Sequence, residues 1–440
     1  LSSTYTKREG TEMVRLSDLQ QHDRDHLLMK QLPAFSPPAF VPPTKPLSEM
    51  RIAIITTAGL HFRGDENYTG PSASYRAIAA AEGTQDLVMS HVSVNYDRGG
   101  FQQDVNVVFP LDRFRELAAE GIIGSIADVH YSFMGGGLMP DAYETSVRSL
   151  APLLKRDGVD AVFITPVCPN CTRSASAIGY YLESEGIMST GIALVRENAE
   201  ALKPPRLLWV TFPLGYPLGK PGDAAFQRRV IMASLDLLTR PEGPVLEDFP
   251  EDVPPAQTSV VEACPVNFAQ PTREPGTWSD QLRNERLLLQ PWYDFSERRR
   301  GRTTVGLSNA GIGEILDMIG GWLDDREQPL PEFRAFKEGV EDAKAWYSEA
   351  ISAQPGDYPP GEVQSHLYAN TVLGAALKEY FHLFIDDRQF ALYARAIAPR
   401  WVVEANTGSE AIDKHGNIIE QPAAKAMRLA LEAGEKGEQL

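Results

Sequence analysis

The chain has 440 residues, of which 43% are hydrophobic and 23% charged, as in ordinary globular proteins. This composition excludes wholesale disorder and fibrous repeats, and the length suffices for two or three domains. The net charge of −17 disfavours nucleic acid and anionic membrane surfaces as partners. Three cysteines are too few for a disulfide framework, and no apolar stretch is long enough to span a bilayer. We therefore expect a soluble, cytoplasmic protein.

The N-terminal stretch is polar and then proline-rich, and we expect residues 1–48 to form an extended arm. Proline removes a backbone donor and fixes φ, so residues 33–46 are neither a helix nor a central strand. Phe35, Phe40 and Val41 lie in this arm. Such apolar side chains favour packing across a neighbouring surface over a free linker.

Residues 49–240 alternate short β-branched runs with amphipathic segments, the pattern of a parallel sheet covered on both faces by helices. This alternation predicts an α/β fold with a doubly wound parallel sheet, similar to flavodoxin or Rossmann folds. The expected strands are 51–56, 87–92, 125–131, 160–165, 187–194 and 207–211. The expected helices are 72–81, 111–121, 142–157, 171–186 and 224–238.

The pattern changes after residue 240. Residues 241–300 are proline-rich, acidic and then irregular, so we expect a linker that contains an ordinary thiol, Cys264. Its basic end, 298–302, is expected on a solvated face or at an interface. Residues 301–440 have helical periodicity and predict a mainly helical C-terminal domain. The expected helices there are 311–323, 331–353, 361–387, 389–398 and 423–435.

The sharpest chemical signal is the CxxC motif of Cys168 and Cys171. It follows a predicted strand and opens a predicted helix, where unpaired backbone N–H groups and the helix dipole favour a thiolate. The two thiols lie one turn apart, within reach of a disulfide, and Arg173 adds a positive charge nearby. We favour a redox or nucleophilic pair; half of a zinc site and two inert cysteines stay open as alternatives.

Histidines also lie near the ends of three predicted strands. His61, His91 and His130 are expected on the rim of the sheet that holds Cys168. A single histidine there is more often structural, but three beside a CxxC motif favour a site, and a metal pocket stays open.

A glycine loop follows the strand that carries His130. Glycine lets a backbone approach a ligand closely, and the loop's N–H groups are candidates for holding a carboxylate, although a plain tight turn is an equal alternative. The loop consists of Met134, Gly135, Gly136 and Gly137. The chain has no dinucleotide-binding glycine motif and no Walker loop, so we predict no bound cofactor.

Five stretches together resemble the selenoprotein B family of glycine, sarcosine, betaine and D-proline reductases. They are residues 50–61, 104–117, 121–127, 130–135 and 158–173, within a resemblance that covers roughly residues 30–222. The resemblance implies that Cys168 replaces the family's selenocysteine and that Cys171 and Arg173 match its cysteine and arginine. A selenol is ionised at neutral pH, whereas a thiol of pKa about 8.5 is mostly not, so the cysteine form depends on its surroundings.

We therefore expect a thiol-dependent reductase that cleaves a C–N or C–S bond of a small carboxylate-bearing molecule. Cys168 is the expected nucleophile and Cys171 the resolving thiol. His61 or His130 is expected to protonate the leaving group. The substrate would be held by Arg173, His91 and the glycine loop, 134–137.

The expected partners follow from the same hypothesis. An external dithiol such as thioredoxin would restore the pair, and a homodimer is expected. The resemblance also implies a partner subunit that bears a pyruvoyl group, which no segment of this chain clearly supplies. Two alternatives remain: a non-catalytic or redox-sensing subunit of a larger reductase complex, and a metal-dependent lyase or hydrolase that uses the rim histidines.

Overall fold

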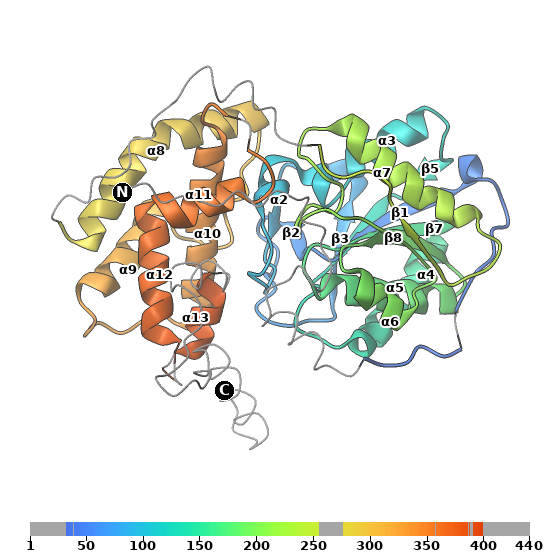
Figure 1. The fold of residues 1–440 in the computed structure, drawn as a ribbon, viewed down its shortest axis with the longest axis horizontal. Coiled ribbons are helices and arrows are strands. Elements are labelled where there is room, and N and C mark those ends of the chain that lie inside the picture. The colour runs from blue at the N-terminus through green and yellow to red at the C-terminus, as the bar shows by residue number, and fades with distance from the viewer. Residues whose placement is uncertain are drawn as a thin grey trace, which may run out of the picture.

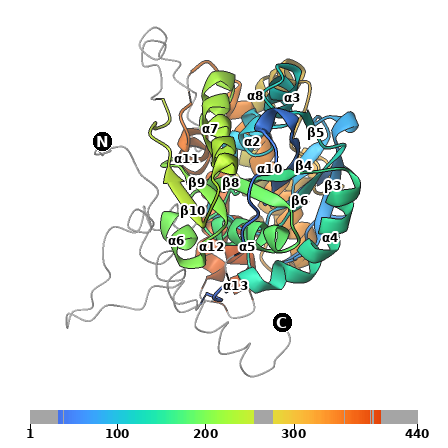
Figure 2. The same ribbon diagram turned by 90° about the vertical axis from the view of Figure 1, so that its right-hand side faces the viewer.

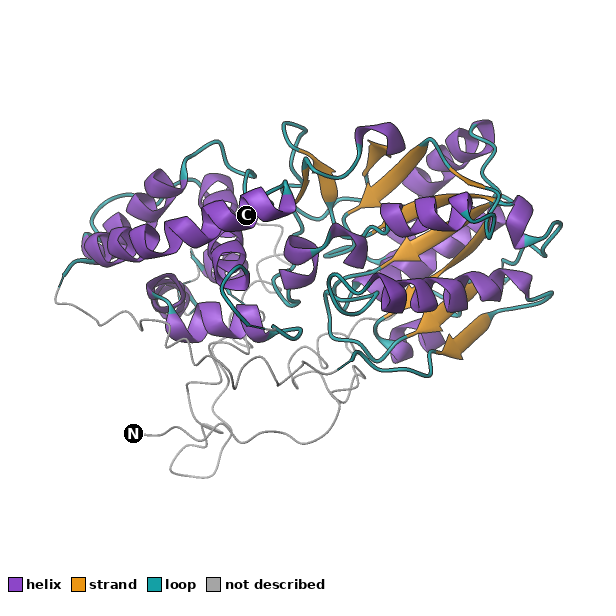
Figure 3. Ribbon diagram, turned by 90° about the horizontal axis from the view of Figure 1, so that it is seen from above, coloured by secondary structure: helices purple, strands orange, loops and turns teal. Residues whose placement is uncertain are grey.

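The structure, a computed structural model, describes residues 32–37, 39–254, 276–356, 358–385, 387 and 390–398. An α/β half and a helical half lie side by side (Figure 1), and the strands are confined to the first of them (Figure 3). Cys264, the expected helix at 423–435 and most of the N-terminal arm lie outside the described residues. No helix within the described part of the chain is both long and apolar enough to cross a membrane.

The α/β half contains a sheet in the order β10-β9-β8-β7-β1-β6-β3, with β5 paired to β1. All of its pairs are parallel except that of β3 with β6. Two short strands, β2 and β4, form a separate antiparallel pair. The bounds are β1 Arg51–Thr56, β2 Leu60–Phe62, β3 Tyr75–Ala79, β4 Leu87–Met89, β5 Ser125–Ile126, β6 Val129–Phe133, β7 Ala161–Thr165, β8 Met188–Ala193, β9 Arg206–Trp209 and β10 Val245–Asp248.

Helices cover both faces of this sheet, which confirms the predicted α/β class (Figure 1). Side chains of β1 alternate between two cores: Ile52 and Ile54 pack in the core that includes α3 and α7, and Ala53 and Ile55 in the core that includes α4 and α5. The helices of this half are α2 Gly99–Gln103, α3 Leu111–Ala119, α4 Glu144–Arg156, α5 Cys171–Ser184, α6 Arg196–Leu202 and α7 Ala224–Asp236.

The strand order reverses beside β1. After β6 the chain crosses to the other side of β1 and continues with β7, β8, β9 and β10. The point of reversal therefore lies between β1 and β7. In doubly wound sheets, ligands bind at this point, outside the carboxyl ends of the strands. Here β1 is followed by Thr57, and β7 is followed by the loop that contains Cys168.

The helical half lies behind the α/β half when the latter faces the viewer (Figure 2). Its core is built from the inward faces of six helices, with Trp346, Tyr347 and Tyr380 among its most buried side chains. The helices are α8 Trp278–Arg300, α9 Ile312–Asp324, α10 Phe333–Ser352, α11 Glu362–Asn370, α12 Val372–Phe384 and α13 Ala391–Ile397.

Four predicted segments were wrong. The expected strand 87–92 of the parallel sheet ends at Met89 and lies outside that sheet, because it pairs antiparallel with β2. The predicted helix at 72–81 is absent, because residues 75–79 form β3. Antiparallel pairing of β3 with β6 overrides the helix propensity of the alanines in this segment. Residues 278–300 are not irregular but form α8, whose N-terminus is capped by the Thr277 side chain, and 245–248 form β10 within the expected linker. The expected helix 361–387 is broken at Thr371, whose side chain caps α12.

The two halves are joined through the segment that follows β4. Asp97 accepts hydrogen bonds from the Tyr216 hydroxyl at 2.6 Å and from the backbone N–H of Gly361, at the start of α11, at 2.8 Å. Arg98 forms an ion pair with Glu341 of α10 at 2.6 Å. These contacts fix one short segment of the α/β half to two helices of the other.

Two arginines of the basic segment 298–302 contribute to the same junction. Arg300 donates to the carbonyl oxygen of Gln102 at 2.5 Å, and Arg302 donates to that of Phe101 at 3.2 Å. Both acceptors lie in α2. Arg300 and Arg302 thus make an interface contact rather than an anion site.

The buried charge of Glu341 predicts a large effect on stability. Burial raises its pKa, but the nearby charges of Arg98, Lys344 and Lys337 outweigh burial and lower it. Glu341→Ala leaves these cations without their partner, and we expect a loss of about 3–5 kcal/mol in the free energy of unfolding, measured by urea denaturation at neutral pH. Because the pKa is depressed, the stabilisation by Glu341 is present above the ordinary carboxyl pKa and lost as pH falls through the lowered one.

The matched control is Arg229→Ala, which removes an exposed ion pair with Glu251. This control should leave the unfolding midpoint nearly unchanged. Equal midpoints for the two variants would contradict the structural importance of Glu341.

Candidate active site at the CxxC motif

The CxxC motif lies at the point where the strand order reverses. Cys168 is in the loop after β7, and Cys171 is the first residue of α5. Both cysteines are free thiols, and their Sγ atoms are 2.6 Å apart. The expected proximity of the two sulfurs is therefore present in the structure, at the edge of the sheet where α/β proteins bind ligands.

His91 contacts one of the two sulfurs. Its Nε2 lies 3.4 Å from Cys171 Sγ, and its Nδ1 accepts a hydrogen bond from the backbone N–H of Ser93 at 3.0 Å. Because Nδ1 is the acceptor, the ring proton of a neutral His91 resides on Nε2. His91 therefore donates a hydrogen bond to Cys171.

The two thiols have opposite tendencies to ionise. Burial raises the pKa of Cys171, but hydrogen bonds from Cys168 and His91 outweigh burial and hold it well below its usual range. Burial and the adjacent charge of Cys171 raise the pKa of Cys168, although the backbone N–H groups of Asn170 and Cys171 act in the other direction. The contact with His91 thus favours the thiolate on Cys171, whereas the sequence assigned it to Cys168.

The glycine loop packs against the thiols. A Cβ atom on Gly135 would lie 2.7 Å from Cys171 Sγ, and one on Gly136 would lie 3.1 Å from His91 Cε1. The N–H of Gly135 donates to the Thr57 carbonyl and that of Gly136 to the Met134 sulfur, so neither is available for a carboxylate. The loop, which ends at Gly137, lets the backbone approach the dithiol closely.

The other two histidines do not contact either sulfur. His130 lies inside β6 instead of after it, because that strand continues to Phe133; its Nδ1 accepts from Ile54 N–H, and burial lowers its pKa to about 4. His61 lies on β2, where its Nδ1 is 2.9 Å from the Phe62 carbonyl, and burial lowers its pKa. Both stay neutral near pH 7, which does not suit the role of proton donor.

Arg173 is a structural neighbour of the motif. Its Nε donates to Asn198 Oδ1 at 2.7 Å, and Asn198 Nδ2 donates to the carbonyl oxygen of Pro169 at 3.0 Å. Burial lowers the pKa of Arg173 to about 10, so it stays charged at neutral pH. Arg173 thereby connects α5, α6 and the CxxC loop.

In the described part of the chain, the side chains of His91, Cys168 and Cys171 form the group that most resembles a metal site. The ligand atoms of His91, Cys168 and Cys171 lie within 4.8 Å of one another. Two thiolates on tetrahedral zinc would be about 3.8 Å apart, given Zn–S bonds of about 2.3 Å. The sulfurs are only 2.6 Å apart, and His91 Nε2 carries a proton instead of a free lone pair. The sulfurs are therefore closer together than two thiolates on tetrahedral zinc.

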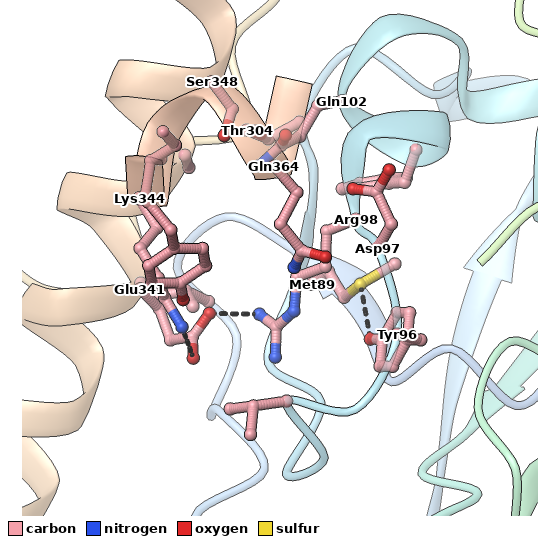
Figure 4. Close-up of a pocket in the computed structure, with 16 residues that line it drawn as sticks. Met89, Tyr96, Asp97, Arg98, Gln102, Thr304, Glu341, Lys344, Ser348 and Gln364 are labelled. Carbon is pink, nitrogen blue, oxygen red and sulfur yellow. Dashed lines mark hydrogen bonds and ion pairs between the residues drawn. The ribbon is translucent and has the colours of Figure 1, made fainter. Parts of the chain in front are cut away.

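Both sulfurs are fully buried, with no exposed surface. The nearest feature of relevance is a cavity of about 50 Å³ between the two halves, lined by Tyr96 and Arg98 on one side and by Glu341 and Lys344 on the other (Figure 4). Neither cysteine lines it. Tyr96 and Ser93 were missed by the sequence interpretation, although their position within five residues of His91 at a strand end was a usable signal.

The hydrogen bond from His91 predicts a change in thiol ionisation. In His91→Ala, burial of Cys171 is less well compensated, so its pKa should rise and the thiolate fraction at neutral pH should fall. The ultraviolet absorbance of the thiolate, followed against pH, measures this. His61→Ala is the control, and an equal change in that variant would count against His91.

The close approach of Gly135 predicts a steric effect. Gly135→Ala should displace Cys171 or Thr57 and cost about 1–3 kcal/mol of unfolding free energy, with altered thiolate absorbance. Gly321→Ala, where the added Cβ meets no atom within 4 Å, is the control and should be neutral or slightly stabilising. A Gly135→Ala protein with normal stability and absorbance would refute this close packing.

Residues 19–167 match the family model described as glycine/sarcosine/betaine reductase selenoprotein B. The match ends one residue before Cys168 and covers about a third of the chain. No solved structure matches the chain.

Curated relatives are components of reductases. The D-proline reductase subunit gamma of Acetoanaerobium sticklandii is 34% identical over 47% of this chain and 86% of that relative. The glycine reductase complex component B subunit gamma of Carboxydothermus hydrogenoformans is 29% identical over 47% of this chain, and the sarcosine reductase complex component B subunit beta of Peptoclostridium acidaminophilum is 28% identical over 45%. The chain spans about half the length of the latter two. The first of these matches, with the family model, shows that the chain belongs to the selenoprotein B family of glycine, sarcosine, betaine and D-proline reductases.

Proposed function

We propose that the chain is a thiol-dependent reductase that cleaves a C–N or C–S bond of a small carboxylate-bearing substrate, with cysteine in place of the family's selenocysteine. The observation that carries the proposal is the pair of sulfurs 2.6 Å apart, one of them bound by His91, at the switch point of the sheet. The reductase names of the curated relatives support the class of reaction.

The dithiol supplies both electrons of the reduction. The Cys171 thiolate attacks the carbon that bears the leaving group; a C–S bond forms, the C–N or C–S bond of the substrate breaks, and the leaving group takes the proton of Cys168. The resulting Cys168 thiolate attacks Cys171 Sγ, which forms the disulfide and returns the C–S electron pair to the carbon. That carbon takes a proton from water, so each turnover converts two thiols into one disulfide.

This order reverses the roles that the sequence suggested for the two cysteines. It rests on the hydrogen bond from His91 to Cys171, which helps to hold the pKa of Cys171 down. His91 makes no such bond to Cys168 among the described contacts. His91 acts as a hydrogen-bond donor to the thiolate and Arg173 as a positioning residue. His61 and His130 have no part in the reaction.

The disulfide must be reduced before the next turnover. An external dithiol protein of the thioredoxin type is the proposed reductant, and a partner subunit is proposed because the relatives are named as subunits or components of reductases. No bound cofactor takes part in this scheme. A homodimer remains part of the proposal.

A second function is favoured by one observation. Because both sulfurs are fully buried, the pair would also suit a redox-sensing or non-catalytic subunit, in which the disulfide changes the structure and another protein carries out the reduction. For the metal-dependent alternative only one of the three rim histidines is left, since His91 lies beside the cysteines whereas His61 and His130 contact neither sulfur.

Serine variants test the reaction and the order of attack. Cys168→Ser and Cys171→Ser should both abolish reductive turnover with dithiothreitol as reductant. With substrate present, Cys168→Ser should accumulate a covalent adduct on Cys171, detectable by mass spectrometry, because the resolving thiol is missing. An adduct on Cys168 in the Cys171→Ser variant would restore the order suggested by the sequence, and full turnover in either variant would refute the reductase mechanism.

A further inference from the structure

The cavity between the two halves is small and its charges are already paired. Its volume of about 50 Å³ holds a few water molecules, since each needs about 10–15 Å³ on this measure. Glu341 lies between Arg98, at 2.6 Å, and Lys344, at 2.8 Å (Figure 4). The polar lining also includes the Asp97 carboxyl group, which accepts hydrogen bonds from Tyr216, Gly99 and Gly361. Its neutral polar side chains include Gln102, Gln364, Ser348, Thr304 and Tyr368.

Tyr96 lies between this cavity and the dithiol. Its side chain lines the cavity, and its ring meets the ring of His91 edge-on, with centroids 5.1 Å apart. His91 in turn contacts Cys171 on its other side. Tyr96 and His91 therefore form one line of contacts that runs from the cavity to Cys171.

The hydrogen bond of the Tyr96 hydroxyl is weak, although its ring is buried in the core and lies beneath the Arg98 guanidinium, 5.6 Å from the ring centroid. Its hydroxyl donates to the thioether sulfur of Met89 at 3.0 Å, and Figure 4 shows this bond at the edge of the cavity. A thioether is a weak acceptor, so a ligand oxygen is a better partner for the same hydroxyl. Burial raises the pKa of Tyr96 well above its usual value, with the nearby charges of Cys171 and Cys168 adding to it, so the hydroxyl stays a donor.

We propose that this cavity is the entrance through which a small substrate reaches the dithiol, and that Tyr96 is the gate that closes it and limits substrate size. The proposal rests on the proposed function and names the access route for the same reaction. Rotation of the Tyr96 side chain opens the cavity toward His91, which contacts Cys171, and the Tyr96 hydroxyl then donates its hydrogen bond to the entering molecule instead of to Met89.

The polar groups that line the cavity indicate which kind of molecule fits into it. Among the contacts of the described residues, Lys344 Nζ donates to Glu341 and to the carbonyl oxygen of Ile397, which leaves one N–H for a carboxylate. The amides of Gln102 and Gln364 suit a second polar group. A compact carboxylate with one further polar group fits, and a molecule with a bulky side chain does not.

Alkylation of the reduced protein tests the gate without any need for turnover. The probe is iodoacetamide, a small neutral molecule, and mass spectrometry of the peptide 168–173 gives the rate at the dithiol. In Tyr96→Ala the alkylation rate should rise at least about tenfold. A tenfold rise means that opening the gate costs about 1.4 kcal/mol less free energy than in the wild-type protein. The alkylation rate with a bulky maleimide should rise less than the rate with iodoacetamide, because the cavity limits the size of the reagent that can enter.

Tyr368→Ala is the matched control, since Tyr368 is also a buried tyrosine of this cavity but lies on α11, in the helical half. Its rate should stay within about twofold of the wild-type protein, a difference below about 0.4 kcal/mol. Tyr96→Leu replaces Tyr96→Ala if the latter unfolds. Equal rates for the Tyr96 and Tyr368 variants would overturn the gate. That result would leave the dithiol mechanism standing, because the mechanism is tested separately by the serine variants.

Discussion

A negative charge on a fully buried sulfur must be compensated by hydrogen-bond donors, and in this protein the compensation starts from one backbone N–H. Ser93 donates to His91 Nδ1, which places the ring proton on Nε2 and directs it at Cys171. Without that donor, the other tautomer would present a lone pair to the thiolate and destabilise it. The reactivity of the dithiol therefore depends on the conformation of the loop after β4, which the CxxC motif itself does not control.

The same loop also joins the two halves of the molecule. His91 contacts Cys171, and Tyr96 packs against His91. The next two residues, Asp97 and Arg98, bind α11 and α10 through Gly361 and Glu341. Arg98 also donates to the carbonyl oxygen of His91 at 2.8 Å. A relative movement of the halves would thus act on His91 through only a few hydrogen bonds and ion pairs.

The sequence predicted the parts of this arrangement that follow from local patterns. The apolar run at 51–56 and the CxxC motif at a strand-to-helix junction were recognisable because burial on both faces and helix N-terminal chemistry leave local signatures. The histidine that contacts Cys171 was not predictable, because three histidines lay near the ends of predicted strands and only tertiary packing selects His91. The strand at 75–79 was missed for a similar reason: its structure is decided by pairing with β6 and not by its own alanines.

The dithiol lies in one half of the molecule, and the other half supplies one wall of the cavity that we propose as its entrance. The matched region of the D-proline reductase subunit gamma makes up 86% of that relative but only 47% of this chain, so the relative is little more than half as long. Both cysteines, His91 and the glycine loop lie in the α/β half, whereas Glu341, Lys344, Gln364 and Tyr368 come from helices of the other half. In the proposed reaction the dithiol and the opposite wall of the cavity therefore belong to different halves of the molecule. Changes of substrate should then arise from substitutions in α10 and α11 that leave the hydrogen bonds of the dithiol untouched.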